Sequence, residues 1–316
     1  MRSLNLPTSR SQRAPRPDRS ATWAFWGLVG PLVMGLIVFT IVPLVWGFAL
    51  SFQNARGTIE FDVSRWVGLD NFRRTLADPA FRESLITGAL YAALVVPLTL
   101  VFGLALALLV NSVRRGQAFF RTALFMPTAV SFVVGALIWK IGLFNGLSFG
   151  IANTVLGLFG WDPIVWTLTS PWVWVVLVSL RLWLTLGFNM LIFLAGLKEV
   201  PAQLYEAARI DGASSWQSFW GITFPLLRNT SIFLLFVNVI GALQAFDEFY
   251  NVLGSGVSSL SSSLAGRPPI WYIYDTGFAT ADYGRGSASA FLLAGIILLA
   301  TLLQVRLFGL GQRQND

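Results

Sequence analysis

The residues of this chain that could do chemistry are few, and most of them interrupt long apolar stretches. The chain of 316 residues contains no cysteine and no histidine, which excludes thiol nucleophiles, disulfides, histidine bases and histidine–metal sites. Polar groups within membrane segments are costly and usually face a cavity or a partner. Six such side chains are candidates to line a path or contact a partner: Arg181, Asn189, Asn238, Gln244, Asp247 and Glu248.

A second group of candidate residues lies in a polar segment, residues 196–227, that is too polar to span a membrane. Pro201 suits the first turn of a helix, where its missing N–H costs nothing. Gly212 can end that helix in the left-handed conformation. Ser214 and Gln217 match a capping box that starts another helix. The segment therefore predicts two short helices joined by a turn.

The first of these helices is expected to present one acid among very small side chains. Glu206, Ile210 and Ala213 recur at helical spacing, with Ala207 and Ala208 beside them. Small side chains let another surface approach closely, so this side of the helix is a candidate docking surface. A loop that only joins two membrane spans would fit the composition equally well.

Composition identifies the elements that must position these residues. Hydrophobic residues make up 55% of the chain and charged residues only 12%, whereas soluble domains carry about 25% charged residues. A bilayer core of about 30 Å needs about 20 apolar helical residues. The sequence therefore predicts an all-α polytopic membrane protein with six transmembrane helices, at about 24–50, 84–110, 120–142, 171–195, 229–251 and 288–309. The second short helix is expected to end at Pro225, next to the fifth span.

The distribution of arginine and lysine predicts the orientation. Residues 1–22 are rich in Arg, Pro and Ser and are expected to form a disordered cytoplasmic tail, followed by a membrane domain over residues 23–316. If both termini lie inside the cell, the cytoplasmic segments hold more Arg and Lys than the outer segments. Because cytoplasmic loops usually carry this excess, both termini are expected to be cytoplasmic. The net charge of +7 is therefore explained by arginine next to membrane spans, and nucleic acid is not expected as a partner.

The pattern of residues 206–225 resembles the EAA loop of permease subunits of binding-protein-dependent ABC importers. The matching residues are Glu206, Ala207, Ala208, Asp211, Gly212 and Ala213, followed by Phe219, Ile222 and Pro225. The resemblance extends over residues 24–309 and is closest to carbohydrate permeases of the maltose and glycerol-phosphate kind. Further matching stretches are 66–81, 103–111, 114–127, 138–140, 194–201 and 244–253.

This resemblance implies a fold and a set of partners. The fold would be that of a type I ABC importer permease (MetI-like). The partners would be a second homologous permease, a dimer of ATPase subunits and an extracytoplasmic sugar-binding protein. The substrate would be a sugar, imported across a bacterial cytoplasmic membrane. ATP and magnesium would be bound by the ATPase, and this chain would hold no cofactor.

The resemblance also assigns roles within the loop. Residues 196–227 would carry the helix that couples to the ATPase, with Glu206 meeting a basic residue there. Ala207 and Ala208 would allow close docking, and Gly212 would permit the turn. Asp211 would hold the turn or pair with Arg209 or Arg228.

In similar permeases the fourth and fifth spans line the substrate pathway. Carried over to this chain, that implication names Trp183, Gly187, Asn238, Gln244 and Asp247 as lining residues. Each has an alternative role. Trp183 suits packing on lipid or on a neighbouring helix, and Gly187 suits helix packing alone.

The charged residues of these spans have alternative roles too. Arg181 suits an inter-subunit or carbonyl contact better than an uncharged sugar, and Asp247 and Glu248 suit solvated acids at an interface. One departure from similar permeases is a Ser-rich outer loop at 255–263, which could alter docking of the binding protein or the outer gate.

Catalysis by the chain itself is not expected. A nucleotide-binding P-loop needs a Gly-Lys-Ser/Thr sequence, and neither Lys140 nor Lys198 lies in one. ATP hydrolysis would therefore belong to another polypeptide. The alternatives are an ion-coupled secondary transporter, for which the spans are poor in acids and show no internal repeat, a polytopic membrane enzyme, or a packing subunit without a ligand.

Overall fold

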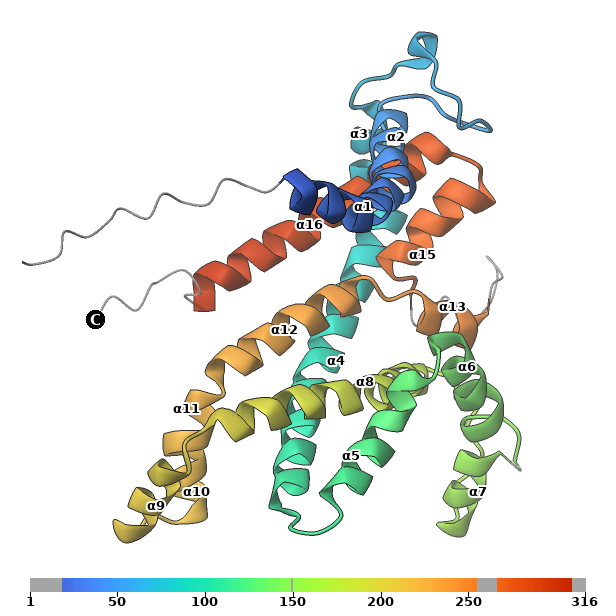
Figure 1. Ribbon diagram of the computed structural model, residues 1–316. Coiled ribbons are helices and arrows are strands. Elements are labelled where there is room, and N and C mark those ends of the chain that lie inside the picture. Colours follow the sequence, from blue (N-terminus) through green and yellow to red (C-terminus); the bar gives the residue numbers. More distant parts are fainter. Residues whose placement is uncertain (1–18, 149, 255–265, 309–316) are drawn as a thin grey trace, which may run out of the picture. The chain divides into compact units, whose positions relative to one another are not determined.

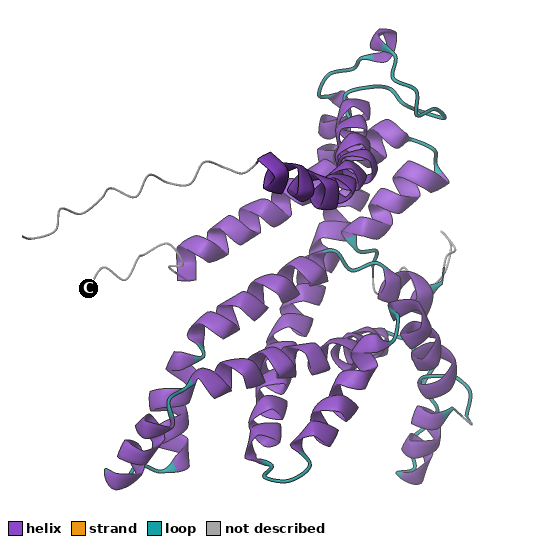
Figure 2. Cartoon of the chain, in the orientation of Figure 1, coloured by secondary structure: helices purple, strands orange, loops and turns teal. Residues whose placement is uncertain are grey.

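The computed structural model describes residues 19–148, 150–254 and 266–308, and these residues form helices joined by loops (Figures 1 and 2). These described residues also include two isolated β-bridges, which pair Gln53 with Trp66 and Arg56 with Asp282. The α-helices are α1 (Arg19–Leu36), α2 (Val42–Leu50), α3 (Asp70–Ala77), α4 (Pro79–Ser112), α5 (Gln117–Phe125), α6 (Phe132–Leu137), α7 (Ile151–Leu158), α8 (Trp172–Glu199), α9 (Ala202–Ile210), α10 (Ser215–Ser218), α11 (Phe224–Leu226), α12 (Arg228–Leu243), α13 (Asp247–Leu253), α15 (Pro269–Tyr274) and α16 (Tyr283–Phe308).

Shorter turns of other helix types continue or connect these helices. The π-helical turns are Ile37–Ile41, Ile138–Leu143, Phe219–Thr223 and Asp275–Ala279, and the 3-10 turns are Val63–Arg65 and Met126–Ala129.

The chain divides into two compact units, residues 1–49 and 50–316. The first unit holds α1, which continues through Ile37–Ile41 into α2 and gives a candidate span over Phe25–Leu50 with a mean hydropathy of 2.5. The expected tail at 1–22 lies outside the described residues as far as residue 18, and its last four residues, 19–22, belong to α1. The first helix therefore begins earlier than the sequence predicts.

The second unit holds the other candidate spans. Three are continuous helices, α4, α8 and α16, with mean hydropathies of 2.7, 1.9 and 2.3. Two more are bent pairs: Gln117–Ala129 with Phe132–Leu143 at 91°, and Ser215–Leu226 with Arg228–Leu243 at 63°. The described residues thus contain four apolar helices long enough to span, or up to six spans if each pair counts as one. This agrees with the expected six-span helical membrane protein.

Two of the expected spans are not the continuous helices that the sequence predicts. The third, 120–142, is broken at Val130 and Ser131, where the Ser131 side chain accepts a hydrogen bond from the Val134 N–H and begins α6. The fifth, 229–251, ends as a helix at Leu243 and resumes only at Asp247.

Apolar packing in the second unit is centred on α4 and α8. One buried cluster joins these helices to α6, α12, α13 and α15 and includes Tyr91, Leu180, Phe249 and Trp271. Another cluster, containing Met190, Phe193, Leu227 and others, joins α4 and α8 to the start of α12. Apolar burial contributes about 25 cal/mol per Å² only for surface removed from water. Close packing and interhelical hydrogen bonds therefore become the main attraction between helices within lipid.

Glycines set the closest approaches between these helices. A Cβ at Gly103 of α4 would lie 3.0 Å from Cβ of Asn189 in α8. A Cβ at Gly187 would lie 2.5 Å from the carbonyl oxygen of Leu124 and 2.7 Å from Cα of Phe125. Since these Gly187 contacts are with backbone atoms, α8 and the end of α5 can pack this closely only around glycine.

The loop between the third and fourth spans is organised by one side chain, Asn153 of α7. Its Nδ2 donates to the carbonyls of Leu147 at 3.0 Å and Ile164 at 3.1 Å. Its Oδ1 accepts from the Ile164 N–H at 3.0 Å and from Trp166 Nε1 at 2.9 Å. Asn153 is 2% exposed, so its bonds are shielded from water.

We predict that Asn153→Ala destabilises this loop by about 1–3 kcal/mol, because it leaves buried donors and acceptors unpaired. Asn251→Ala is the matched control, since Asn251 is only partly buried and its side chain donates to a single carbonyl within its own helix, α13. Limited proteolysis in detergent should cut between residues 145 and 166 faster in the first variant only. Equal cutting of both variants would contradict this role for Asn153.

Candidate functional site

The loop between α8 and α12 folds into a hairpin of short helices. Pro201 precedes α9, one position before the helical position expected for it. Gly212 ends the hairpin's first arm with φ +77°, in the left-handed region as expected. Ser214 Oγ accepts from the Gln217 N–H at 3.3 Å, and Gln217 Oε1 accepts from the Ser214 N–H at 2.7 Å. This reciprocal pair is the predicted capping box.

The second arm of the hairpin ends close to the expected position. The helical segment runs over Ser215–Leu226, includes a π-helical turn at Phe219–Thr223, and ends one residue after Pro225. The helical path bends next to Leu227 and continues into α12.

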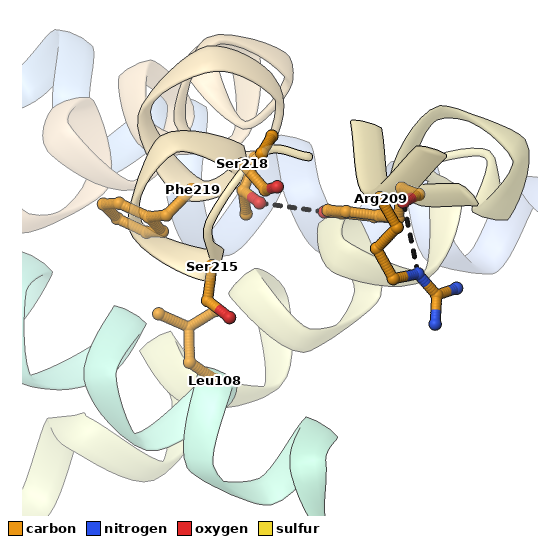
Figure 3. Close-up of a pocket in the computed structure, with 8 residues that line it drawn as sticks. Leu108, Arg209, Ser215, Ser218 and Phe219 are labelled. Carbon is orange, nitrogen blue, oxygen red and sulfur yellow. Dashed lines mark hydrogen bonds between the residues drawn. The ribbon is translucent and has the colours of Figure 1, made fainter. Parts of the chain in front are cut away.

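A hydrogen bond between side chains holds the two arms of the hairpin, α9 and the segment Ser215–Leu226, together. Tyr205 Oη and Thr223 Oγ1 lie 2.9 Å apart, which joins α9 to the segment that enters the fifth span. A cavity of about 340 Å³ lies beside this bond. Figure 3 shows its wall, with Arg209 from α9, Ser215 from the α10 arm and Leu108 from α4. The cavity thus lies where the hairpin meets the cytoplasmic end predicted for α4.

The hairpin presents the predicted docking residues at its surface. Glu206, Ala207, Asp211 and Gly212 are exposed, and Ala208 and Ala213 are half-buried. Ile210 on the same helix is 86% exposed. Within the described part of the chain, the Glu206 carboxylate has no ion pair or hydrogen bond. An exposed acid between small side chains can accept a basic group from another molecule without rearranging this chain.

Among the described residues, Asp211 forms an ion pair with neither Arg209 nor Arg228. Arg209 Nε donates to the Tyr205 carbonyl at 3.4 Å, and Arg228 Nη2 donates to the Phe308 carbonyl at 2.7 Å. The remaining option, holding the turn, stays a prediction. The Arg228 bond instead links the start of α12 to the end of α16.

The candidate pathway residues fall into two groups. Trp183 is half-buried against Trp139, with ring centroids 4.6 Å apart, and Gly187 is buried against the end of α5. Asn238 is 8% exposed, and its Nδ2 donates to Asn189 Oδ1 at 2.7 Å. Gln244 and Asp247 are exposed, and both lie at the break between α12 and α13. The first group supports helix packing, and the second faces outward from this chain.

Arg181 and Glu248 form an ion pair that the sequence analysis missed. Arg181 Nη1 lies 3.0 Å from Glu248 Oε1, which also accepts from Tyr91 Oη at 3.0 Å. Glu248 is 2% exposed, so the expectation of a solvated interface acid is wrong for this residue. In the part of the chain that the structure describes, the Arg181 guanidinium donates to this carboxylate of the same chain and not to a backbone carbonyl. The available signal was that two ionisable residues in apolar stretches need partners.

A further polar cluster links three segments outside the long apolar core. Asp78 precedes α4 and accepts hydrogen bonds from Tyr272 Oη at 2.8 Å and from the Arg285 guanidinium. Partial burial opposes ionisation, but the bonds from Tyr272 and Ala80 and the Arg285 charge hold the pKa of Asp78 below its usual value. Burial and the hydrogen bond to Asp78 raise the pKa of Tyr272 from 10.0 to about 12.

The raised pKa of Tyr272 predicts that the protein loses stability at alkaline pH. Because its pKa is higher in the folded state, its contribution is fully present below pH 10 and is lost as the pH rises through about 12. Melting temperatures in detergent should therefore fall more steeply between pH 10 and 12 for the parent chain than for Tyr272→Phe. Parallel curves for the two proteins would exclude this linkage, and Tyr283→Phe serves as the control.

The fold and the hairpin define a class: a helical multi-span membrane protein with a hairpin of short helices between two spans, which exposes an acidic side chain. Residues 99–309 match the family model described as a binding-protein-dependent transport system inner membrane component. The chain belongs to this family and is a multi-pass membrane component of a transport system.

Named relatives and solved structures agree with this assignment. The chain is 32% identical to the arabinooligosaccharides transport system permease protein AraP of Halalkalibacterium halodurans, covering 89% of this chain and 86% of the relative. It is 32% identical to the sn-glycerol-3-phosphate transport system permease protein UgpA of Agrobacterium fabrum, covering 87% and 92%. It is also similar to a chain of a bacterial ABC transporter that imports the acidic polysaccharide alginate, at a TM-score of 0.79, 22% identity and coverage of 93% and 98%. That last likeness shows the fold.

Proposed function

We propose that this chain is the permease subunit of an ATP-driven sugar importer and forms half of the translocation pathway. The observation that carries the proposal is the exposed helix α9, fixed to the fifth span by the bond between Tyr205 and Thr223. Family membership and relatives named for arabinooligosaccharides and for trehalose and maltose support the sugar class.

In this proposal the hairpin transmits movement from an ATPase to the membrane helices. A separate ATPase dimer binds ATP and magnesium and closes around α9. Glu206 meets a basic residue of the ATPase, and the small side chains of Ala207 and Ala208 allow close approach. Because Tyr205 ties α9 to the entry of the fifth span at Thr223, a push on α9 moves that span. This chain holds no cofactor of its own.

The remaining partners complete the pathway. A second homologous permease supplies the other half, and an extracytoplasmic sugar-binding protein delivers the substrate. This chain is similar to a chain of a bacterial alginate ABC transporter in complex with an alginate pentasaccharide-bound periplasmic protein, which supports a partner of this kind. Both termini lie in the cytoplasm of a bacterium, so the hairpin faces the ATPase. Gln244 and Asp247 line the pathway, and alternating access exposes them to one side at a time.

The charge of the pathway bears on the choice of substrate. Arg181 is bonded to Glu248, and the polar candidates exposed at the break are an amide, Gln244, and an acid, Asp247. Amide and carboxylate groups suit sugar hydroxyls, and the acid disfavours an anionic substrate. An uncharged saccharide is therefore the substrate class that this half of the pathway favours.

Reconstitution of the native complex tests the proposal. The tagged chain, purified with its co-isolated subunits, should import a radiolabelled neutral oligosaccharide into proteoliposomes when ATP is supplied to the side that carries the hairpin. Uptake should require the binding protein and stop without magnesium. Uptake driven by an ion gradient in the absence of ATP would instead establish a secondary transporter.

A further inference from the structure

The fifth span is broken at Gln244–Phe246, where the sequence contains no proline and no Gly/Ser pair. α12 ends at Leu243, Phe246 has φ −142° and ψ −57°, and α13 starts at Asp247. Sharp breaks in helices are usually caused by proline, by Gly/Ser pairs, by π-bulges or by a side chain inserted into the ladder. The three residues at the break are Gln, Ala and Phe. The contacts that other helices make on each side of the break therefore bear directly on its cause.

The guanidinium of Arg181 reaches both sides of the break. Before it, in α12, a Cβ at Gly241 would lie 2.7 Å from Arg181 Nη2, so the guanidinium packs closely against the α12 backbone there. After it, in the first turn of α13, Glu248 Oε1 lies 3.0 Å from Arg181 Nη1. The guanidinium also lies over the ring of Phe132 in α6, 5.0 Å from the ring centroid.

Further contacts hold Glu248 and its helix in place. Tyr91 of α4 donates to Glu248 Oε1 at 3.0 Å, and the Tyr91 ring packs edge-on against Phe249 with centroids 4.9 Å apart. Ala245 within the break and Phe249 are 1% and 0% exposed. An ionised pair buried in a membrane protein is costly unless both groups are satisfied. Here the ion pair joins α8 to α13, and the hydroxyl of Tyr91 in α4 donates a second hydrogen bond to the Glu248 carboxylate.

We propose that Arg181, Glu248 and Tyr91 are positioning residues that hold the fifth span broken and thereby keep Gln244 and Asp247 facing the pathway. Broken helices in transporters place unwound backbone and polar side chains at substrate sites. The role of the pair in transport depends on the proposed function, whereas its role in the break does not.

The break can be tested without transport, because the native chain has no cysteine. A single Ala245→Cys substitution in the assembled complex should react slowly with a membrane-impermeant maleimide, since this position is buried. Adding Glu248→Gln or Arg181→Met should speed labelling at least tenfold. Arg74→Met, which breaks the exposed Arg74–Asp70 pair in α3, is the control and should not change the rate. Unchanged labelling in both pair variants would overturn the proposal.

Transport kinetics give the second readout. In proteoliposomes, Glu248→Gln and Arg181→Met should raise the KM for saccharide at least tenfold, and Arg181→Lys should restore part of the loss. Wild-type KM in both variants would contradict the positioning role. Where a pair variant does not assemble, Tyr91→Phe removes one hydrogen bond only and should give a smaller change in the same direction, and no change in labelling or KM would overturn the proposal. If the parent complex imports no saccharide, the proposed function fails while the labelling assay still tests the break.

Discussion

A Glu206→Ala variant should fold normally yet bind the ATPase more weakly and lose at least 90% of ATP-driven uptake. Within the described residues the Glu206 carboxylate has no partner, and its side chain is exposed. Removing it should therefore change the chain's own stability by no more than about 0.5 kcal/mol, as is usual for surface positions. Truncating one partner of a charge pair across an interface costs about 2–5 kcal/mol. That cost corresponds to more than a tenfold loss of affinity for the ATPase.

The measurement compares uptake in proteoliposomes with the amount of ATPase that co-purifies. Glu83→Ala is the matched control, because Glu83 is also an exposed helical acid but belongs to the first part of α4, at the predicted outer side. This control should transport normally. Full uptake by Glu206→Ala would remove Glu206 from the docking surface.

Gly187→Ala should destabilise the folded chain by about 1–3 kcal/mol, the usual cost of overpacking a well-packed core. The added Cβ would lie 2.5 Å from the Leu124 carbonyl oxygen and 3.0 Å from Thr128 Oγ1. The backbone of Leu124 cannot rotate away as a side chain could, so α5 and α8 must separate.

Thermal unfolding in detergent checks this prediction. Gly295→Ala in α16 is the control, because a Cβ there meets no atom within 4 Å and alanine favours the helix. The melting temperature should fall for the first variant and stay level or rise for the second. Equal melting temperatures would mean that the α5–α8 contact is looser than the structure has it.

Local signals made the hairpin readable from the sequence. Ser214 and Gln217 act on each other's backbone within four residues, and Gly212 is the residue type that a left-handed turn prefers. Long apolar runs likewise predicted the membrane class, because a span is defined by its own composition. These features need no knowledge of distant neighbours.

The two broken spans differ in how far the sequence could have predicted them. Pro127 and Ser131 are local signals near the first break, and the Ser131 cap shows that they act there. The second break has no proline and no serine cap. The residues proposed to hold it are Arg181, 63 or more positions earlier, and Tyr91, earlier still. Pairing of Arg181 with Glu248 depends on which helices pack together, and apolar periodicity does not specify that.

The proposed coupling requires contact between α9 and a separate ATPase, and a single cross-linking measurement tests that contact directly. Ile210 is 86% exposed on α9, and the chain has no native cysteine, so Ile210→Cys gives one addressable thiol on this subunit. In the native complex, a short thiol-to-amine cross-linker at this position should yield a covalent adduct with an ATPase subunit, identified by mass spectrometry. The same probe at Glu83→Cys should yield none. A complex that contains the ATPase but gives no adduct from position 210 would contradict the account.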